Sequence, residues 1–133
     1  MAILIDADVI FQAERGLFDL DRWLTSQPDE EFKIAAITVA ELWYGVERAT
    51  GSHRAKRRLF LQHFLPAFEF VSYTEKAAAE HARLWAEMES TSHLIGAHDM
   101  MLAAIALHAG GFLATFSKRH FASIKGLTIV TPT

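Results

Sequence analysis

Three carboxylates are spread along the chain at places where the local sequence could bring them to one site. Asp6 follows a short apolar run, whereas Glu41 and Asp99 lie near the beginnings of two helical stretches. Two unit charges about 4 Å apart repel by roughly 4 kcal/mol at an effective dielectric of 20, so converging carboxylates must take up protons, move apart or bind a cation. Because the chain has no cysteine, no thiolate can bind a metal. The hard oxygen ligands of carboxylates favour Mg²⁺ or Mn²⁺.

Each of these acids also has an ordinary structural explanation. Asp6 or Asp8 could cap a helix, and Asp99 could be a first-turn acid favoured by the helix dipole. Glu41 follows Thr38 at the spacing of a capping box, in which both side chains satisfy free backbone N–H groups. Taken singly, these explanations are favoured. Only the convergence of all three carboxylates favours a metal site.

The surrounding sequence alternates between strand and helix patterns. Short apolar runs predict strands at 1–5, 32–36, 68–71, 112–115 and 127–130. Amphipathic spacing, caps and breakers predict helices at 9–14, 20–26, 39–49, 53–65, 74–89, 97–109 and 119–123. The face of the fifth helix is expected to carry Ala77, His81, Leu84, Trp85 and Met88.

Alternating strands and helices predict a three-layer α/β/α domain with a mostly parallel, roughly five-stranded sheet. With 133 residues, 51% of them apolar, the chain suits one domain over residues 1–133 with a sizeable core. In such sheets ligands bind at the carboxyl ends of the strands, where Asp6 and the turn after Thr115 are expected. No secretory leader and no apolar run of about 20 residues is visible, so we expect a soluble, cytoplasmic protein without membrane contact.

Four blocks of sequence, in order, resemble the motifs of PIN-domain nucleases, and in particular the VapC-type toxins of toxin–antitoxin pairs. The blocks are DADVI at 6–10, ITVAELWYG at 37–45, IGAHD at 95–99 and LATFSKRHF at 113–121. The resemblance implies a parallel sheet with flanking helices. It also implies Mg²⁺- or Mn²⁺-dependent hydrolysis of RNA phosphodiester bonds, leaving a 5′-phosphate, together with a homodimer and an antitoxin segment bound in a groove.

Carried over by position, the resemblance makes Asp6, Glu41 and Asp99 the metal-binding and catalytic acids. Two places depart from the family pattern. Ser117 stands where the family often has a fourth acid or an asparagine, and His120 replaces a further acid. Both changes remove negative charge.

Asp8 restores part of that charge, because the family more often has a neutral residue there. We therefore expect one firmly bound metal, with Asp8, Thr115 and Ser117 as additional candidate ligands.

Several basic, histidine and aromatic residues near these blocks could contact RNA or a protein partner, or pack in the core. Lys118 and Arg119 are candidate RNA contacts because they directly follow a strand end, while the basic run at 53–58 could bind phosphates or be a solvated helix start. His81 is expected in the core or an interface, and His98 is expected to point away from Asp99. Trp43 and Tyr44 could stack on bases, but their position on the helix that carries Glu41 favours a protein-binding groove.

Two other functions compete with the metal-dependent endoribonuclease toxin. One is a catalytically weak PIN protein that acts mainly as a binding partner in a toxin–antitoxin or DNA-bound regulatory complex. The other is a nucleotide or phosphate binder of the α/β class. It is disfavoured because no glycine-rich phosphate loop follows the first strand. The net charge of −3 argues against a broadly basic nucleic-acid coat.

Overall fold

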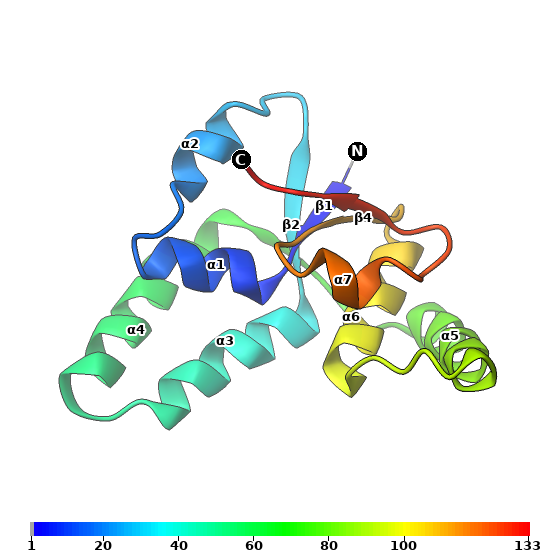
Figure 1. Ribbon diagram of the computed structural model, residues 1–133. Helices are drawn as coiled ribbons and strands as arrows, with labels where there is room; N and C mark the ends of the chain where they lie inside the picture. The colour runs from blue at the N-terminus through cyan, green and yellow to red at the C-terminus, as the bar shows by residue number, and fades with distance from the viewer. Residues whose placement is uncertain (1) are drawn as a thin grey trace.

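A five-stranded sheet with the order β3-β2-β1-β4-β5 runs through the computed structural model, which describes residues 2–133 (Figure 1). All neighbouring strands are parallel. The strands are β1 (Ala2–Ile5), β2 (Glu31–Ala35), β3 (Glu69–Val71), β4 (Phe112–Ala114) and β5 (Thr128–Val130). Met1, which the first predicted strand included, lies outside the described residues.

The helices occupy the segments between the strands, as predicted, with ends that differ by a few residues. They are α1 (Ala7–Glu14), α2 (Leu20–Thr25), α3 (Ala36–Arg48), α4 (Gly51–Phe64), the short 3-10 helix η1 (Leu65–Ala67), α5 (Glu75–Thr91), α6 (Ala97–His108) and α7 (Lys118–Phe121). Within residues 2–133, none of the helices combines the length and apolar character that a membrane span requires.

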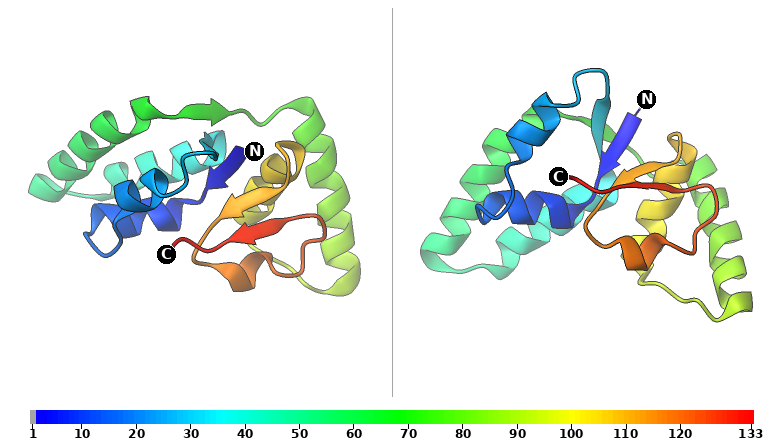
Figure 2. Two further views of the ribbon diagram at one scale, coloured as in Figure 1. Left: turned by 90° about the horizontal axis from the view of Figure 1, so that it is seen from above. Right: turned by 45° about the horizontal axis from the view of Figure 1, so that its top comes forward.

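Two hydrophobic cores, one on each face of the sheet, define the layers. Ile3 and Ile5 of β1 join residues of α1 to α4 in one core, whereas Leu4 joins α5, α6 and α7 in the other. This alternation follows from the two-residue period of a strand. Figure 2 shows α5 and α6 on one side of the sheet and α1 to α4 on the other. The predicted three-layer α/β/α fold is therefore confirmed.

The predicted start of α3 is wrong. The helix begins at Ala36, directly after β2, and its N-cap residue Ala35 makes no side-chain capping bond. Thr38 is fully buried, and its Oγ1 has no hydrogen-bond partner within residues 2–133. Because no loop separates the strand from the helix, Thr38 is already inside the first turn. Glu41 consequently lies in the second turn and is not the acid of a capping box.

The buried face of α5 is narrower than its spacing predicts. Ala77, Leu84 and Met88 are buried, but Trp85 is 54% exposed. His81 is half-buried, and its Nδ1 lies 2.8 Å from the Tyr73 hydroxyl oxygen. The aromatic part of the predicted stripe therefore lies at the edge of the helix–helix contact and not within it.

Strand order places the ends of β1 and β4 side by side. Ile5 is in register with Ala114, and the backbone N–H of Asp6 donates to the Ala114 carbonyl oxygen at 2.9 Å. The chain leaves β1 toward β2 on one side, while β4 lies on the other, which makes this point a topological switch in the sheet. Asp6 and Thr115, the first residues after these strands, are thereby neighbours.

Two glycines allow the close backbone approach that starts β4. Gly111 has φ +90°, and a Cβ atom there would lie 2.7 Å from the Gly126 carbonyl oxygen. The Gly111 carbonyl oxygen also accepts a 2.7 Å hydrogen bond from the Thr128 N–H. A side chain at Gly111 would force apart the segments that lead into β4 and β5.

We predict that Gly111→Ala destabilises the fold more than Gly110→Ala does. Both glycines have positive φ, but nothing lies within 4 Å of a Cβ at Gly110. Both variants should lose about 1–2 kcal/mol from backbone strain, and only Gly111→Ala adds the backbone clash. Denaturant unfolding of both variants measures the difference. Equal losses of unfolding free energy would show that the close approach of Gly111 to Gly126 adds nothing to the cost of a side chain at Gly111.

Candidate active site

Asp6 is the buried carboxylate at the centre of the site. It is the N-cap residue of α1, and its Oδ1 accepts a 2.7 Å hydrogen bond from the Ala7 N–H. Its Oδ2 accepts a 2.8 Å bond from the Thr115 hydroxyl. Only 6% of the residue is exposed. Asp6 therefore caps a helix, as its ordinary explanation requires, and also meets a residue from the far end of the chain.

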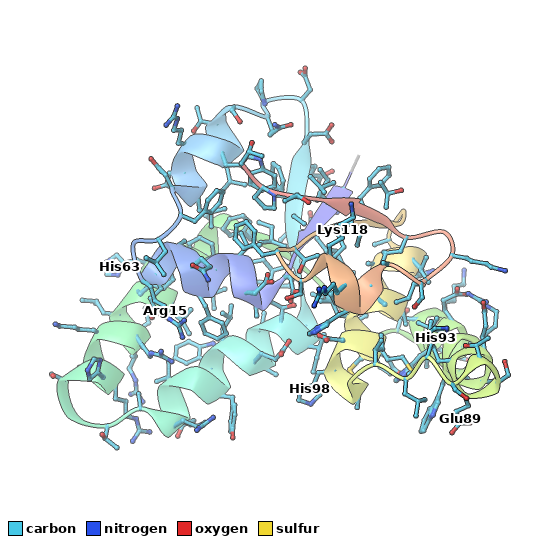
Figure 3. All side chains as sticks on the ribbon, viewed as in Figure 1. Arg15, His63, Glu89, His93, His98 and Lys118 are labelled. Atoms are coloured by element: carbon cyan, nitrogen blue, oxygen red, sulfur yellow. The ribbon has the colours of Figure 1, made fainter. Side chains whose placement is uncertain are left out.

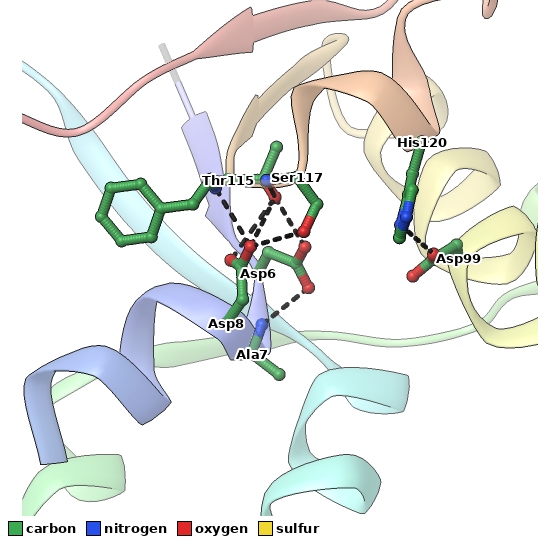
Figure 4. A network of polar contacts seen from close by, with 8 residues as sticks. Asp6, Ala7, Asp8, Asp99, Thr115, Ser117 and His120 are labelled. Atoms are coloured by element: carbon green, nitrogen blue, oxygen red, sulfur yellow. Dashed lines mark hydrogen bonds and ion pairs between the residues drawn. The ribbon is translucent and has the colours of Figure 1, made fainter. Parts of the chain in front are cut away.

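Asp8 and Ser117 complete a polar network beside Asp6 (Figure 4). Asp8 Oδ2 accepts bonds from the Ser117 hydroxyl at 2.8 Å and from the Phe116 N–H at 3.1 Å. The Thr115 Oγ1 lies 3.2 Å from the same oxygen and accepts a 2.9 Å bond from the Ser117 N–H. Ser117 thus supplies a neutral donor to Asp8 at the place where the family often has an acid.

Asp99 reaches the same edge of the sheet from α6. Its Oδ2 lies 3.1 Å from Nδ1 of His120, which comes from α7, and Figure 4 shows this pair beside the Asp6 network. The contact between Asp99 and His120 was not predicted. The available signal was the position of His120 among the motif residues, where the family carries an acid.

Electrostatics shows that the acids influence one another. Burial, first of all, and the charges of Asp8 and Asp99 together raise the pKa of Asp6 to about 7, against the hydrogen bonds from Thr115 and Ala7, which lower it. Without a compensating cation, a carboxyl group with such a pKa is about half protonated at pH 7.

Glu41 belongs to the same electrostatic group. Burial raises its pKa, the charge of His98 opposes this, and the charges of Asp99 and Asp8 raise it again. The predicted acids therefore share one end of the sheet.

The donor set fits a hard divalent cation. Carboxylate oxygens of Asp6 and Asp8 and the Thr115 hydroxyl are grouped at one point. The raised pKa of Asp6 reflects burial first and then the negative charge of Asp8 and Asp99, which a cation would offset. In the described part of the chain, no three histidine, aspartate or glutamate side chains surround one position in the present arrangement. Asp99, held by His120, and Glu41 stand around this pair as further candidate ligands.

The remaining candidate residues lie around this centre. Lys118 and Arg119 are exposed on α7, the short helix that also carries His120. His98 is exposed and, as expected, does not share the Asp99 contact with His120.

A groove of about 920 Å³ begins at Glu41 and His98 and extends between α1, α3 and the start of α4. Three arginines also line it, Arg15, Arg48 and Arg57. The first two were not singled out in the sequence, because they lie at the ends of separate helices and form no local pattern.

An α/β protein with a carboxylate site at the switch point of a parallel sheet is the class that this geometry defines. The sequence matches the PIN domain family over residues 3–127. The chain therefore belongs to the PIN domain family.

Individual proteins of known name resemble this chain in sequence or in structure. It is 29% identical to Ribonuclease VapC1 of Rickettsia felis over 132 residues, which is 98% of this chain and 96% of that protein. Among solved structures, VapBC2 from Rickettsia felis, bound to a promoter DNA fragment, gives a TM-score of 0.89 at 22% identity and covers 98% of both chains. A second structure is that of VapBC-5 from Mycobacterium tuberculosis, a member of the VapBC family of toxin-antitoxin systems. It gives a TM-score of 0.76 at 23% identity, and the match covers 97% of both chains.

We predict that, in EDTA, the free energy of unfolding falls as the pH rises from about 4 to 7. The pKa of Asp6 is about 7 in the fold, against 3.8 for an unperturbed aspartate, so over this range the folded state holds a proton that the unfolded state has released. The fall should amount to a few kcal/mol.

Asp6→Asn should flatten this slope, whereas Asp21→Asn, which changes an exposed acid of α2, should not. Urea unfolding at a series of pH values measures the effect. An unchanged slope in Asp6→Asn would contradict the assignment of the raised pKa to this carboxyl.

Proposed function

We propose that the protein is a metal-dependent endoribonuclease toxin of the VapC type, which hydrolyses RNA phosphodiester bonds and is neutralised by a cognate antitoxin. The observation that carries the proposal is the burial of Asp6 beside Asp8 and Thr115 at the switch point of the sheet. Membership of the PIN domain family and similarity to a VapC ribonuclease support it.

In this proposal Asp6, Glu41 and Asp99 hold Mg²⁺ or Mn²⁺, with Asp8 as an additional ligand. A bound divalent cation lowers the pKa of a water molecule and offsets charge on phosphoryl oxygens. Hydrolysis joins the hydroxyl of water to phosphorus and breaks the bond to the 3′-oxygen, which takes up a proton. The products are a 5′-phosphate and a 3′-hydroxyl.

The side chains around the acids have positioning roles. The Thr115 hydroxyl fixes the orientation of Asp6, and the Ser117 hydroxyl and Phe116 N–H fix that of Asp8. His120 holds Asp99 against α7. These bonds keep the carboxylates in one orientation before RNA arrives, so little reorganisation accompanies the reaction.

The proposed partners are RNA and an antitoxin protein. Similarity to structures of toxin–antitoxin complexes supports the antitoxin, and Lys118 and Arg119 on α7 remain candidate RNA contacts. A homodimer and a cytoplasmic location also remain predictions. Sedimentation of the purified chain tests the homodimer.

We predict that the purified protein cleaves RNA in Mg²⁺ or Mn²⁺ and that EDTA abolishes cleavage. Asp6→Asn should lower the rate at least about a hundredfold, since even outer-shell partners of metal ligands contribute up to that much. Incubation with tRNA and rRNA, followed by end-group analysis for 5′-phosphates, measures the activity. Asp21→Asn, which makes the same change on exposed α2, is the matched control.

Equal cleavage by wild type and Asp6→Asn, or cleavage that survives EDTA, would refute the nuclease proposal. If neither protein cleaves while the wild type binds a small protein encoded beside it, the alternative of a binding partner is favoured.

We predict that Ser117→Asp makes stability depend more strongly on divalent cations. A carboxylate in place of the hydroxyl that donates to Asp8 at 2.8 Å would add repulsion in EDTA and a ligand in Mg²⁺. Ser117→Ala removes only the hydrogen bond, about 1 kcal/mol, and should respond little to the cation. Thermal unfolding of both variants with and without Mg²⁺ measures this; identical responses would place Ser117 outside the metal site.

A further inference from the structure

We propose that the groove between α1, α3 and the start of α4 carries the backbone of a single RNA strand, with Arg15 and Arg48 as its phosphate-binding residues. This inference rests on the proposed ribonuclease function. It assigns the substrate path to a surface separate from Lys118 and Arg119.

The groove opens directly onto the candidate active site. Glu41 and His98 line it at one end, and Tyr44 and Arg48 line it further along α3. Residues at i, i+3 and i+7 share one face of a helix, so Glu41, Tyr44 and Arg48 form a continuous stripe. The stripe is about 10 Å long, at 1.5 Å per residue. Figure 3 shows Arg15 and His98 toward opposite ends of α3.

The positive charge of the groove is available to a ligand. Arg15 and Arg48 are exposed, and neither makes an ion pair within residues 2–133. By contrast, Arg54 pairs with Glu47 at 2.9 Å. Glu41, at the active-site end, is the one acid among the described residues that line the groove. On a chain of net charge −3, this local excess of cations is complementary to a polyanion.

A third arginine is built into the floor. Arg57 Nη1 donates to the Gly45 carbonyl oxygen at 3.3 Å, and its guanidinium lies over the Phe11 ring, 6.0 Å from the centroid. A Cβ atom at Gly45 would lie 3.0 Å from the same Nη1. Glycine at this position therefore leaves room for the Arg57 guanidinium to cross beneath the groove.

An aromatic side chain among these cations favours a single-stranded nucleic acid. Tyr44 is 61% exposed, and the Arg48 guanidinium lies 5.6 Å from the centroid of its ring. Sites for single strands combine a positive groove with aromatic rings on which bases stack. Trp43, the other aromatic residue assigned to a groove from the sequence, instead packs against the core. An acidic peptide would also meet the arginines, but it would present neither bases to Tyr44 nor a phosphodiester to Glu41.

The test measures binding separately from cleavage. The full chain carrying Asp6→Asn, in EDTA, is titrated against a fluorescein-labelled 12-nucleotide single-stranded RNA of mixed sequence at several KCl concentrations. Two double variants are compared in this background. Arg15→Gln/Arg48→Gln changes the groove, and Arg22→Gln/Arg83→Gln makes the same charge change at exposed arginines that do not line it.

The groove variant should lower the slope of log affinity against log salt by about 1.4, because each phosphate contact on a single strand contributes about 0.7. If the two proteins bind equally at 1 M salt, this change of slope makes the binding of the groove variant about 25-fold weaker at about 0.1 M. Tyr44→Leu should weaken binding about fivefold or more without changing the slope, since it removes stacking and no charge. Circular dichroism confirms that each variant is folded.

Equal losses in the two double variants would overturn the proposal, as would displacement of the RNA by a 12-residue polyglutamate peptide at equal concentration, which would indicate an acidic-protein groove. Cleavage by the wild type with unaltered binding in the groove variant refutes this inference alone. Loss of RNA binding in the groove variant, with no cleavage by the wild type, supports the groove and refutes the ribonuclease proposal.

Discussion

The site depends on the pairing of β1 with β4. The Asp6 N–H donates to the Ala114 carbonyl oxygen, and one residue further on the Thr115 hydroxyl donates to the Asp6 carboxylate. The second of these bonds joins residues that are 109 positions apart in the chain. Because the carboxylate is almost completely buried, loss of the hydrogen bond from Thr115 would leave it unsatisfied and destabilise the fold. Helices α1 and α7 begin beside this junction, so their acids and donors are positioned by it.

Close packing of acids gives this junction its chemical character. Burial and the neighbouring charges of Asp8 and Asp99 disfavour the ionised form of Asp6. The neutral Ser117 and the imidazole of His120 stand where further acids would increase the repulsion, and each contacts one carboxylate directly. The arrangement therefore groups several oxygen donors at one point while limiting the negative charge that the fold must tolerate there.

Helix α3 links the acidic site to the basic groove. Its continuous start from β2 turns Glu41 toward the other carboxylates, and the same helical face carries Tyr44 and Arg48. A capping box at Thr38 would have begun the helix later and tied Glu41 to the backbone. Burial of Thr38 inside the first turn leaves the Glu41 carboxylate free of the helix start, so a local feature of chain connectivity decides where a candidate site residue lies.

The sequence by itself determined the layer architecture and singled out three candidate acids. Strand and helix periods are local properties, and Asp6, Glu41 and Asp99 lie at ends of elements whose carboxyl edge a parallel sheet brings together. Only the tertiary structure decided which partners those acids meet. Bonds from Thr115 and Ser117 to Asp6 and Asp8, the contact of His120 with Asp99, and the grouping of Arg15 with Arg48 depend on strand order and helix packing. These contacts join residues that are distant in the chain. The helix and strand periods of a sequence relate only neighbouring residues, so they cannot predict such contacts.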